Sequence, residues 1–239
     1  MKNAFPGIPK EGIGFLRDLA KNNNREWFAP RKEIHEEKVR QPVLALVEAV
    51  HREMARFAPD YVGDPAKCVY RIYRDTRFSK DKTPYKTHAG ALMWRNGTSK
   101  NEGAAFYFGI SPKSVEVAAG IYAPDPATLL LLRNHIAISH AAFRATFEKP
   151  RVKKLMGELH GESLSRAPKG FDPEHPAADL LRRKRLVLYT ELDPKLATTP
   201  AVVKEIVTRF EALTPFVEYL NGPVLRHLAK RRRDEAFFD

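Results

Sequence analysis

The residues best suited to chemistry in this chain lie in one segment, residues 69–88, which reads VYRIYRDTRFSKDKTPYKTH. Six cationic side chains share this segment with two aspartates and three tyrosines. Arginine presents a planar fork of donors that fits a phosphate or carboxylate, lysine adds a point charge, and hydroxyl groups add neutral hydrogen bonds. The segment therefore predicts an anion-binding site made by Arg71, Arg74, Arg77, Lys80, Lys82, Tyr85 and Lys86.

The expected ligand of this site is a phosphate-containing small molecule or a nucleic acid. A base could stack on Tyr85, as bases stack on the aromatic side chains of proteins that bind single strands. Asp75 and Asp81 are candidates for a general base beside the cations, but their spacing singles out neither of them. The residue pattern thus leaves open whether the protein is an enzyme, and it predicts no cofactor.

A second class of function remains open for the same segment. Asp75 and Asp81 would pair with neighbouring cations, so that residues 71–88 form an ion-pair clamp in a non-catalytic protein-interaction domain. Six cations against two acids leave positive charge without a local partner, which favours the anion site. Distant carboxylates such as Glu33, Glu36 or Glu37 could supply the missing partners, which keeps the clamp open as an alternative.

The elements that must position these residues are strands. Short runs rich in β-branched and aromatic residues recur between residues 67 and 122, separated by turn-forming positions, and they predict an antiparallel meander. The SPKS turn at 111–114 has the length of a hairpin loop. If Val69 to Asp75 is a strand, neither of its faces is apolar, so part of it must border solvent or a polar cleft. The loop that follows is stiffened at Pro84.

Helical patterns flank the predicted strands. Residues 42–57 place Val43, Leu46, Val47, Val50, Met54 and Phe57 on one face. Pro42 suits the first turn of that helix. Asn23 is the expected N-cap of an earlier helix, with Glu26 completing a capping box. Asp125 is the expected N-cap of a later helix that begins at Pro126.

The expected fold is a single α+β domain over residues 1–239. Helices at 12–57 precede the meander at 67–122, and helices at 125–160, a basic turn-rich crossing at 163–184, a strand at 185–191 and a helix at 199–221 follow it. The last helix is expected to end near Asn221, Gly222 and Pro223. The antiparallel sheet would then have about five strands and be covered mainly by helices.

Composition limits the setting of this domain. The chain has 239 residues, of which 43% are apolar, and a formal net charge of +12, so it can bury a core while its surface attracts anions. One cysteine, Cys68, excludes an internal disulfide framework and favours a cytoplasmic protein. No run of apolar residues approaches the ~20 needed to span a bilayer, so no membrane partner is expected. Composition predicts no oligomeric state.

Other chemical templates fit the sequence less well. The eight histidines lack the His-Glu-x-x-His pattern, so no metal is predicted. Glu191, Asp193 and Lys195 have the spacing of a metal-dependent nuclease triplet, although Asp193 followed by proline is also an ordinary helix cap. The basic run Lys230 to Arg233 is either a solvated helix end or a further phosphate contact.

Four motifs in this chain resemble those of a widespread family of bacterial and fungal proteins, known as domain of unknown function 2461. They are NNNREWF at 22–28, RIYRDTRFSKDKTPYKTH at 71–88, GIYAPDP at 120–126 and RAPKGFDPEHPAADLL at 166–181. The resemblance runs from about Gly14 to beyond Phe210 and implies that the four motifs belong to one folding unit. It supplies no activity, cofactor or catalytic residue, so the functional expectation depends on the residues themselves.

Overall fold

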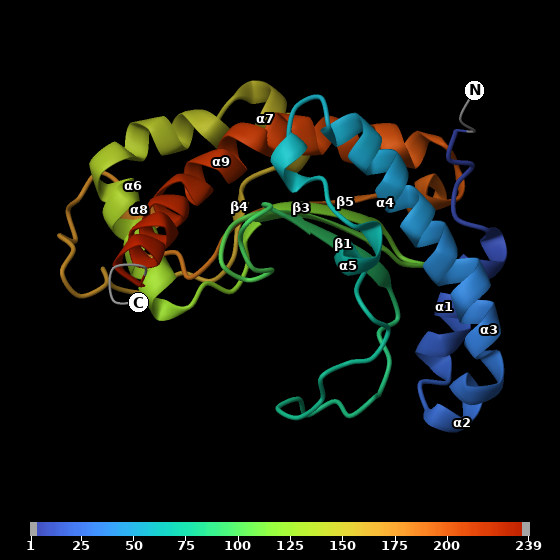
Figure 1. Cartoon of the computed structure of the whole chain (residues 1–239). Coiled ribbons are helices and arrows are strands. Elements are labelled where there is room, and N and C mark those ends of the chain that lie inside the picture. Colours follow the sequence, from blue (N-terminus) through green and yellow to red (C-terminus); the bar gives the residue numbers. More distant parts are fainter. Residues whose placement is uncertain (1–3, 236–239) are drawn as a thin grey trace. The chain divides into compact units, whose positions relative to one another are not determined.

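The computed structural model describes residues 4–235, which adopt an α+β fold with one five-stranded antiparallel sheet (Figure 1). The strands are β1 (Ala89–Trp94), β2 (Ala105–Ile110), β3 (Val115–Ile121), β4 (Leu159–His160) and β5 (Leu186–Leu192). Their order in the sheet is β1-β2-β3-β5-β4, and β4 pairs with β5 in the register Leu159 to Leu188. The predicted fold class is confirmed, as is the hairpin at 111–114, which joins β2 to β3.

The chain divides into two compact units, which are described separately. The first unit comprises the described residues up to Met93 together with Tyr107–Val117 and Glu191–Thr208. The second comprises Trp94–Phe106, Ala118–Thr190 and the described residues from Arg209 onward. The expectation of a single domain stays a prediction.

The helices of the first unit follow the apolar periodicity of the sequence. They are α1 (Lys10–Lys21), α2 (Arg25–Phe28), α3 (Lys32–His35), α4 (Gln41–Met54) and α5 (Pro65–Cys68), with short 3-10 or π-helical turns at Ala29–Arg31, Glu36–Arg40, Pro59–Tyr61 and Pro194–Thr198. In α4, Pro42 lies in the first turn, and the predicted apolar face is buried from Val43 to Met54. The predicted cap of α2 is wrong by one residue, because the side chain of Asn24, and not of Asn23, accepts the hydrogen bond from the Trp27 amide.

A hydrophobic cluster fills the core beside these helices. Its buried members are Phe15, Leu16, Leu19, Phe28, Val39 and Tyr85, with Trp27, Ile72 and Ala89 packed against it. Tyr85 and Ile72 come from the cationic segment, so part of that segment belongs to the core. Burial of this apolar surface fixes both ends of the segment against the helices.

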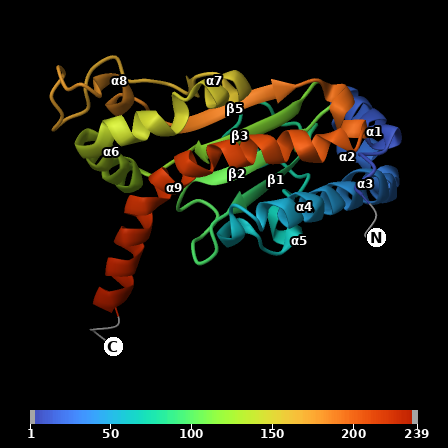
Figure 2. The ribbon, with the colours of Figure 1, turned by 90° about the horizontal axis from the view of Figure 1, so that it is seen from above.

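The second unit packs two long helices through aromatic side chains. Its helices are α6 (Pro126–Phe147), α7 (Pro150–Met156), α8 (Ala178–Leu181) and the part of α9 (Ala201–Glu235) that begins at Arg209. Figure 2 shows α6 beside α9, where the ring centroids of Phe143 and Phe216 are 5.6 Å apart. The ring centroids of Phe210 on α9 and Phe106 on β2 are 5.0 Å apart. Asp125 caps α6 as predicted, accepting hydrogen bonds from the amides at 127 and 128.

The predicted end of the C-terminal helix is wrong. Helix α9 continues through Pro223 to Glu235, so the basic run Lys230 to Arg233 is helical. Asn221 does not terminate the helix, because its buried side chain accepts a hydrogen bond from the Ala104 amide and donates one to the Ala104 carbonyl. The aromatic end of the chain lies outside the described residues.

The predicted strand from Val69 to Asp75 is also wrong. Helix α5 ends just before it, at Cys68, and the segment itself contributes only isolated bridges, from Val69 to Ala91 and from Tyr73 to Tyr85. In an extended segment Arg71 and Asp75 would lie on one face and Arg74 on the other, so neither face is apolar enough to be buried in a sheet. Within residues 4–235, the helices include none that is both long and apolar enough to cross a membrane.

Candidate functional site

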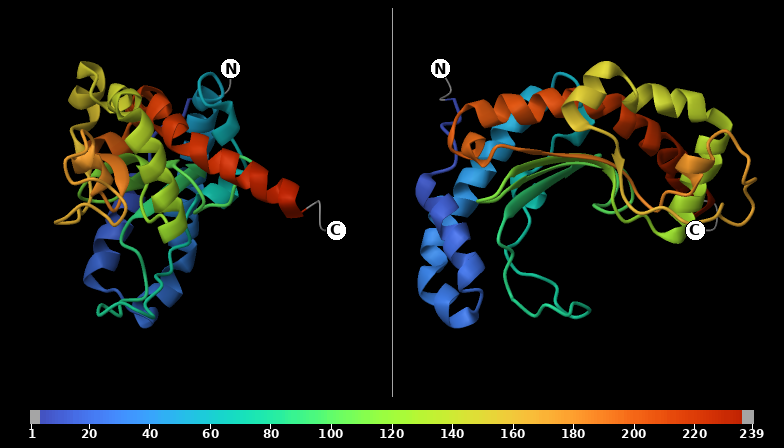
Figure 3. Two further views of the ribbon diagram at one scale, coloured as in Figure 1. Left: turned by 90° about the vertical axis from the view of Figure 1, so that its left-hand side faces the viewer. Right: turned by 180° about the vertical axis from the view of Figure 1, so that it is seen from behind.

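The cationic segment forms a long loop on a two-limbed stem. We call residues 74–84 the basic loop, and residues 69–73 with 85–88 the stem. Main-chain hydrogen bonds join the limbs, from the Arg74 amide to the Pro84 carbonyl (2.9 Å) and from the Lys86 amide to the Ile72 carbonyl (2.8 Å). The Tyr70 amide donates to the Gly90 carbonyl of β1 (2.9 Å). Figure 1 and the right-hand view of Figure 3 show the loop extending away from β1.

The stem is fastened to the helices of the first unit by Asn23. Its side-chain amide donates to the Tyr85 carbonyl (2.8 Å), and its side-chain oxygen accepts from the Tyr85 amide (3.0 Å). The ring of Tyr85 stacks on Phe28 with centroids 4.2 Å apart and is 5% exposed. Tyr85 therefore anchors the loop, and its buried ring does not offer the face that stacking on a base requires.

Arg74 holds the basic loop together from within. Its guanidinium donates to the Asp81 carboxylate (2.5 Å), to the Thr83 carbonyl (3.2 Å) and to the Thr83 hydroxyl. The Thr83 amide also donates to Asp81 (2.9 Å), and this bond, together with Arg74, lowers the pKa of Asp81 to about 2. This part of the loop has the character of the predicted ion-pair clamp.

The second aspartate pairs with Arg77 at the exposed part of the loop. Arg77 donates to Asp75 through Nε (3.0 Å) and through Nη2 (2.8 Å), and these bonds lower the pKa of Asp75 to about 2. The side chain of Arg77 is 77% exposed, so solvent screens this pair. A carboxylate with such a low pKa is a weak base, which makes both Asp75 and Asp81 poorly suited to general-base catalysis near neutral pH.

The lysines of the segment also differ in burial and in hydrogen bonding. Lys86 is half-buried and donates to the main-chain carbonyls of Arg71 (2.6 Å) and Tyr73 (2.9 Å), and exposed Lys82 donates to the Thr76 carbonyl (2.9 Å). The side chains of Arg71 and Lys80 are exposed and form no hydrogen bond or ion pair with a residue in the described range 4–235. The site is thus divided between three residues that shape the loop, the buried Tyr85 and the half-buried Arg74 and Lys86, and four exposed cations, Arg71, Arg77, Lys80 and Lys82.

The sequence reasoning missed one residue of the loop. Phe78 is 94% exposed, and the guanidinium carbon of Arg77 lies 5.7 Å from its ring centroid. The ring therefore presents an open aromatic face to solvent beside the exposed cations, where a ligand could stack on it. The signal was present in the sequence, since every other residue from position 75 to 81 is charged or carries a hydroxyl group.

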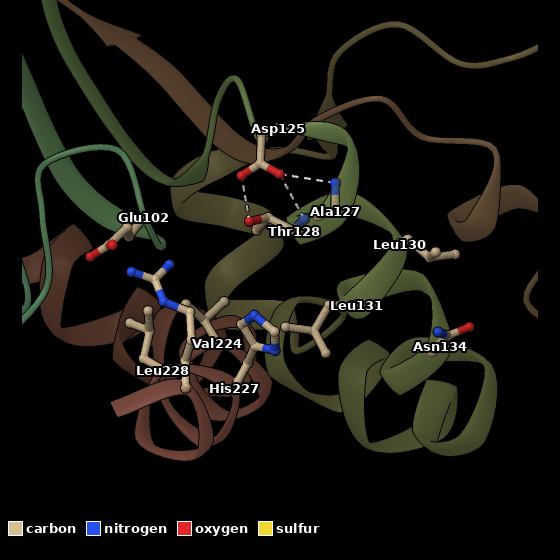
Figure 4. Close-up of a pocket in the computed structure, with 11 residues that line it drawn as sticks. Glu102, Asp125, Ala127, Thr128, Leu130, Leu131, Asn134, Val224, His227 and Leu228 are labelled. Carbon is tan, nitrogen blue, oxygen red and sulfur yellow. Dashed lines mark hydrogen bonds between the residues drawn. The ribbon is translucent and has the colours of Figure 1, made fainter. Parts of the chain in front are cut away.

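A cavity in the second unit is separate from this segment in the chain. Its volume is about 430 Å³, and it is lined by Glu102, Asp125, Ala127, Thr128, Leu130, Leu131, Asn134, Val224, His227, Leu228 and Arg231 (Figure 4). The Asp125 carboxylate is committed to the cap of α6, because it accepts from the amides of Ala127 (2.9 Å) and Thr128 (3.0 Å). None of the predicted site residues lines this cavity.

The remaining templates behave as ordinary structural features. Asp193 accepts a hydrogen bond from the Lys195 amide (2.8 Å) and caps the turn at Pro194–Thr198, which is the capping role proposed for it. Within residues 4–235, histidines, cysteines and acidic residues form no group of three that could hold a metal ion.

The fold and the site define an α+β protein with a protruding basic loop anchored to its own core. The chain belongs to the family described as conserved hypothetical protein (DUF2461), whose model matches residues 11–219. The comparison with curated proteins gave no match, and neither did the comparison with solved structures. The family description carries no activity, so the function must be argued from the loop.

Proposed function

We propose that the protein binds single-stranded nucleic acid in the cytoplasm, with phosphates at the four exposed cations and a base stacked on Phe78. The observation that carries this proposal is the exposure of Phe78, 94%, in a loop that also exposes Arg77, Lys80 and Lys82. Proteins that bind single strands combine a cationic path for the backbone with aromatic side chains for the bases. A phosphorylated small molecule is usually enclosed in a concave pocket, which a protruding loop does not supply.

The charges of the segment support the same ligand. Six cations and two carboxylates in residues 69–88 leave a net charge of +4, within a chain of net charge +12. The pair between Arg77 and Asp75 does not prevent binding, because an exposed ion pair is weak and a phosphate can replace the carboxylate at little cost. The half-buried Arg74 bonds to Asp81 and Thr83 across the loop, and this restriction of the loop lowers the entropy lost on binding.

The alternative function is a non-catalytic protein-interaction domain. The contacts of Arg74 with Asp81 and Thr83 favour it, because they use a cation of the segment as a structural clamp. In that case Phe78 would pack on a protein partner, and nucleic acid would bind only through the overall positive charge.

The test measures the affinity of the purified protein for fluorescent 12-nucleotide DNA and RNA strands by anisotropy, at 50 and 200 mM salt. Phe78→Ala is expected to weaken binding by about 1–3 kcal/mol, the usual contribution of a stacked base, and Phe78→Leu should not restore it. Arg77→Ala/Lys80→Ala should weaken binding and reduce the salt slope by about 1.4, because each phosphate contact contributes about 0.7 on single strands.

The matched control is Arg52→Ala/Lys67→Ala, which removes the same charge from exposed positions of the same unit. If this control weakens binding as much as the loop variant, the general charge binds the strand and the proposal is wrong. The proposal is also wrong if the protein binds anionic lipid vesicles more tightly than either nucleic acid and Phe78→Ala removes that preference. Loop variants that lower the melting temperature while leaving affinity unchanged would support the ion-pair clamp.

A further inference from the structure

A second polar group in the first unit lies where the stem meets the sheet. It consists of Tyr107 on β2, Glu116 on β3 and His88 just before β1, all of which are half-buried. The Tyr107 hydroxyl donates to the Glu116 carboxylate at 3.3 Å. On β2 the two neighbours of Tyr107, Phe106 and Phe108, are fully buried. Because side chains alternate between the two faces of a strand, the Tyr107 hydroxyl and the Glu116 carboxylate that it contacts lie on the opposite face of the sheet.

Two glycines leave space for this polar group. A Cβ atom on Gly109 would lie 2.5 Å from the Tyr107 hydroxyl and 2.8 Å from a Glu116 carboxylate oxygen. A Cβ atom on Gly90 of β1 would lie 2.9 Å from the same hydroxyl. Any other residue at Gly109 would therefore displace the pair, and a strand interior is otherwise an unfavourable place for glycine.

Two members of this group, Glu116 and His88, have hydrogen-bonding positions to spare. Over residues 4–235, the long bond from Tyr107 is the only hydrogen bond that the Glu116 carboxylate accepts, and the ring of His88 makes none. Both side chains are half-buried rather than enclosed, so a ligand that reaches them can use the free carboxylate lone pairs and the imidazole N–H. Burial lowers the pKa of His88, with Glu116 opposing and Lys86 adding to the shift, so the ring is neutral near pH 7 and can donate through one nitrogen.

The stem connects this group to the basic loop. Tyr70 and Lys86 belong to the stem, and the Lys86 ammonium lies 5.6 Å from the Tyr70 ring centroid. The rings of Tyr70 and Tyr107 have centroids 6.4 Å apart. A strand bound along the loop and stem would therefore bring a base to an aromatic ring, a carboxylate and a neutral imidazole.

We propose that Tyr70, His88, Tyr107 and Glu116 form a subsite for one guanine of the bound strand, an inference that rests on the proposed nucleic-acid binding. A carboxylate can accept two parallel hydrogen bonds, and guanine offers two adjacent donors, at N1 and at the N2 amino group. The imidazole donates to the guanine O6. Adenine and cytosine offer a single amino group on this edge, and uracil or thymine offers a single imide, so they satisfy the carboxylate less well.

The test compares four 12-nucleotide strands that are identical oligothymidines except for one central guanine, inosine, adenine or thymine. Wild-type protein should bind the guanine strand about fivefold or more tightly than the adenine strand, as a bidentate contact discriminates. Inosine lacks the N2 amino group and should lose most of this preference. Glu116→Gln keeps the shape of the side chain and should remove the preference while binding oligothymidine as the wild type does or slightly more tightly.

Control variants separate this inference from the proposed function. Glu158→Gln removes an equal charge from an exposed position of the second unit and should keep the guanine preference. Gly109→Ala should lose it, because the new Cβ displaces Tyr107 and Glu116. Equal affinity of the wild type for all four strands, with the loop variants still defective, would overturn the guanine subsite and leave the proposed function standing. No binding of any strand would overturn both.

Discussion

Replacing Asn23 with alanine should release the basic loop from the helices of the first unit. Asn23 is half-buried and makes two hydrogen bonds to the main chain of Tyr85, which lies 62 residues further along the chain. These bonds pin the stem next to the stacked rings of Phe28 and Tyr85. The variant therefore measures how much of the loop position depends on one side chain.

The expected fall in the free energy of unfolding follows from the two hydrogen bonds that Asn23→Ala removes. Each contributes about 0.5–1.5 kcal/mol net, and a main-chain group left without its partner in a buried place costs about 1–3 kcal/mol. Because Asn23 is half-buried, water can reach part of the space that alanine leaves. Two main-chain groups of Tyr85 lose their partner, which would cost about 2–6 kcal/mol if both were fully buried. The free energy of unfolding should therefore fall by about 2–3 kcal/mol, at the lower end of that range.

Urea denaturation measures the change in free energy, and hydrogen exchange of the Arg74 and Lys86 amides reports on the stem, because both donate across it. Asn22→Ala is the matched control: its exposed side chain bonds only within α1 and its end, so stability should change by less than about 0.5 kcal/mol. Unchanged stability and unchanged exchange in Asn23→Ala would refute the reasoning, since the loop would then be held by packing of Tyr85 alone.

Three further outcomes are expected. Asn221→Ala should lower the free energy of unfolding by about 2–4 kcal/mol in urea denaturation, because the main chain of Ala104 loses two buried hydrogen bonds, whereas exposed Asn134→Ala should have little effect. Burial lowers the pKa of His51 below 6.5, so the unfolded state binds the proton first and stability should fall as the pH drops below that value; His51→Gln should reduce this slope in denaturation curves at pH 5 to 7. If all four exposed cations of the segment contact phosphates, affinity for a single strand should fall about 50-fold between 50 and 200 mM salt, and a salt-independent affinity would contradict this.

Local physical chemistry made several elements predictable from the sequence. The face of α4 follows from apolar residues at helical spacing, and the cap of α6 follows from Asp125 before proline, because both depend on neighbours within a few residues. The cationic, acidic and aromatic residues of segment 69–88 could likewise be read directly from the sequence. The class of ligand was therefore an inference from residue types alone, and it stays a prediction.

Elements that depend on distant partners were not predictable in this way. Asn23 and Asn24 are chemically identical in the sequence, and only the position of Tyr85 decides which one caps α2 and which one holds the stem. Asn221 has the composition of a helix end, yet its partner, Ala104, lies 117 residues earlier and helix α9 continues. The segment after Cys68 has β propensity but only isolated bridges, because a strand requires a neighbour that buries one of its faces.

The sequence by itself determined which charges and rings the segment carries and which helices accompany them, because these follow from residue type and short-range spacing. Only the tertiary structure decided which of these groups face solvent. Arg74 and Arg77 are alike in sequence context, but one is 26% exposed and closes the loop while the other is 77% exposed. Burial and pairing depend on contacts between segments far apart in the chain, and such contacts leave no periodic signal in the sequence.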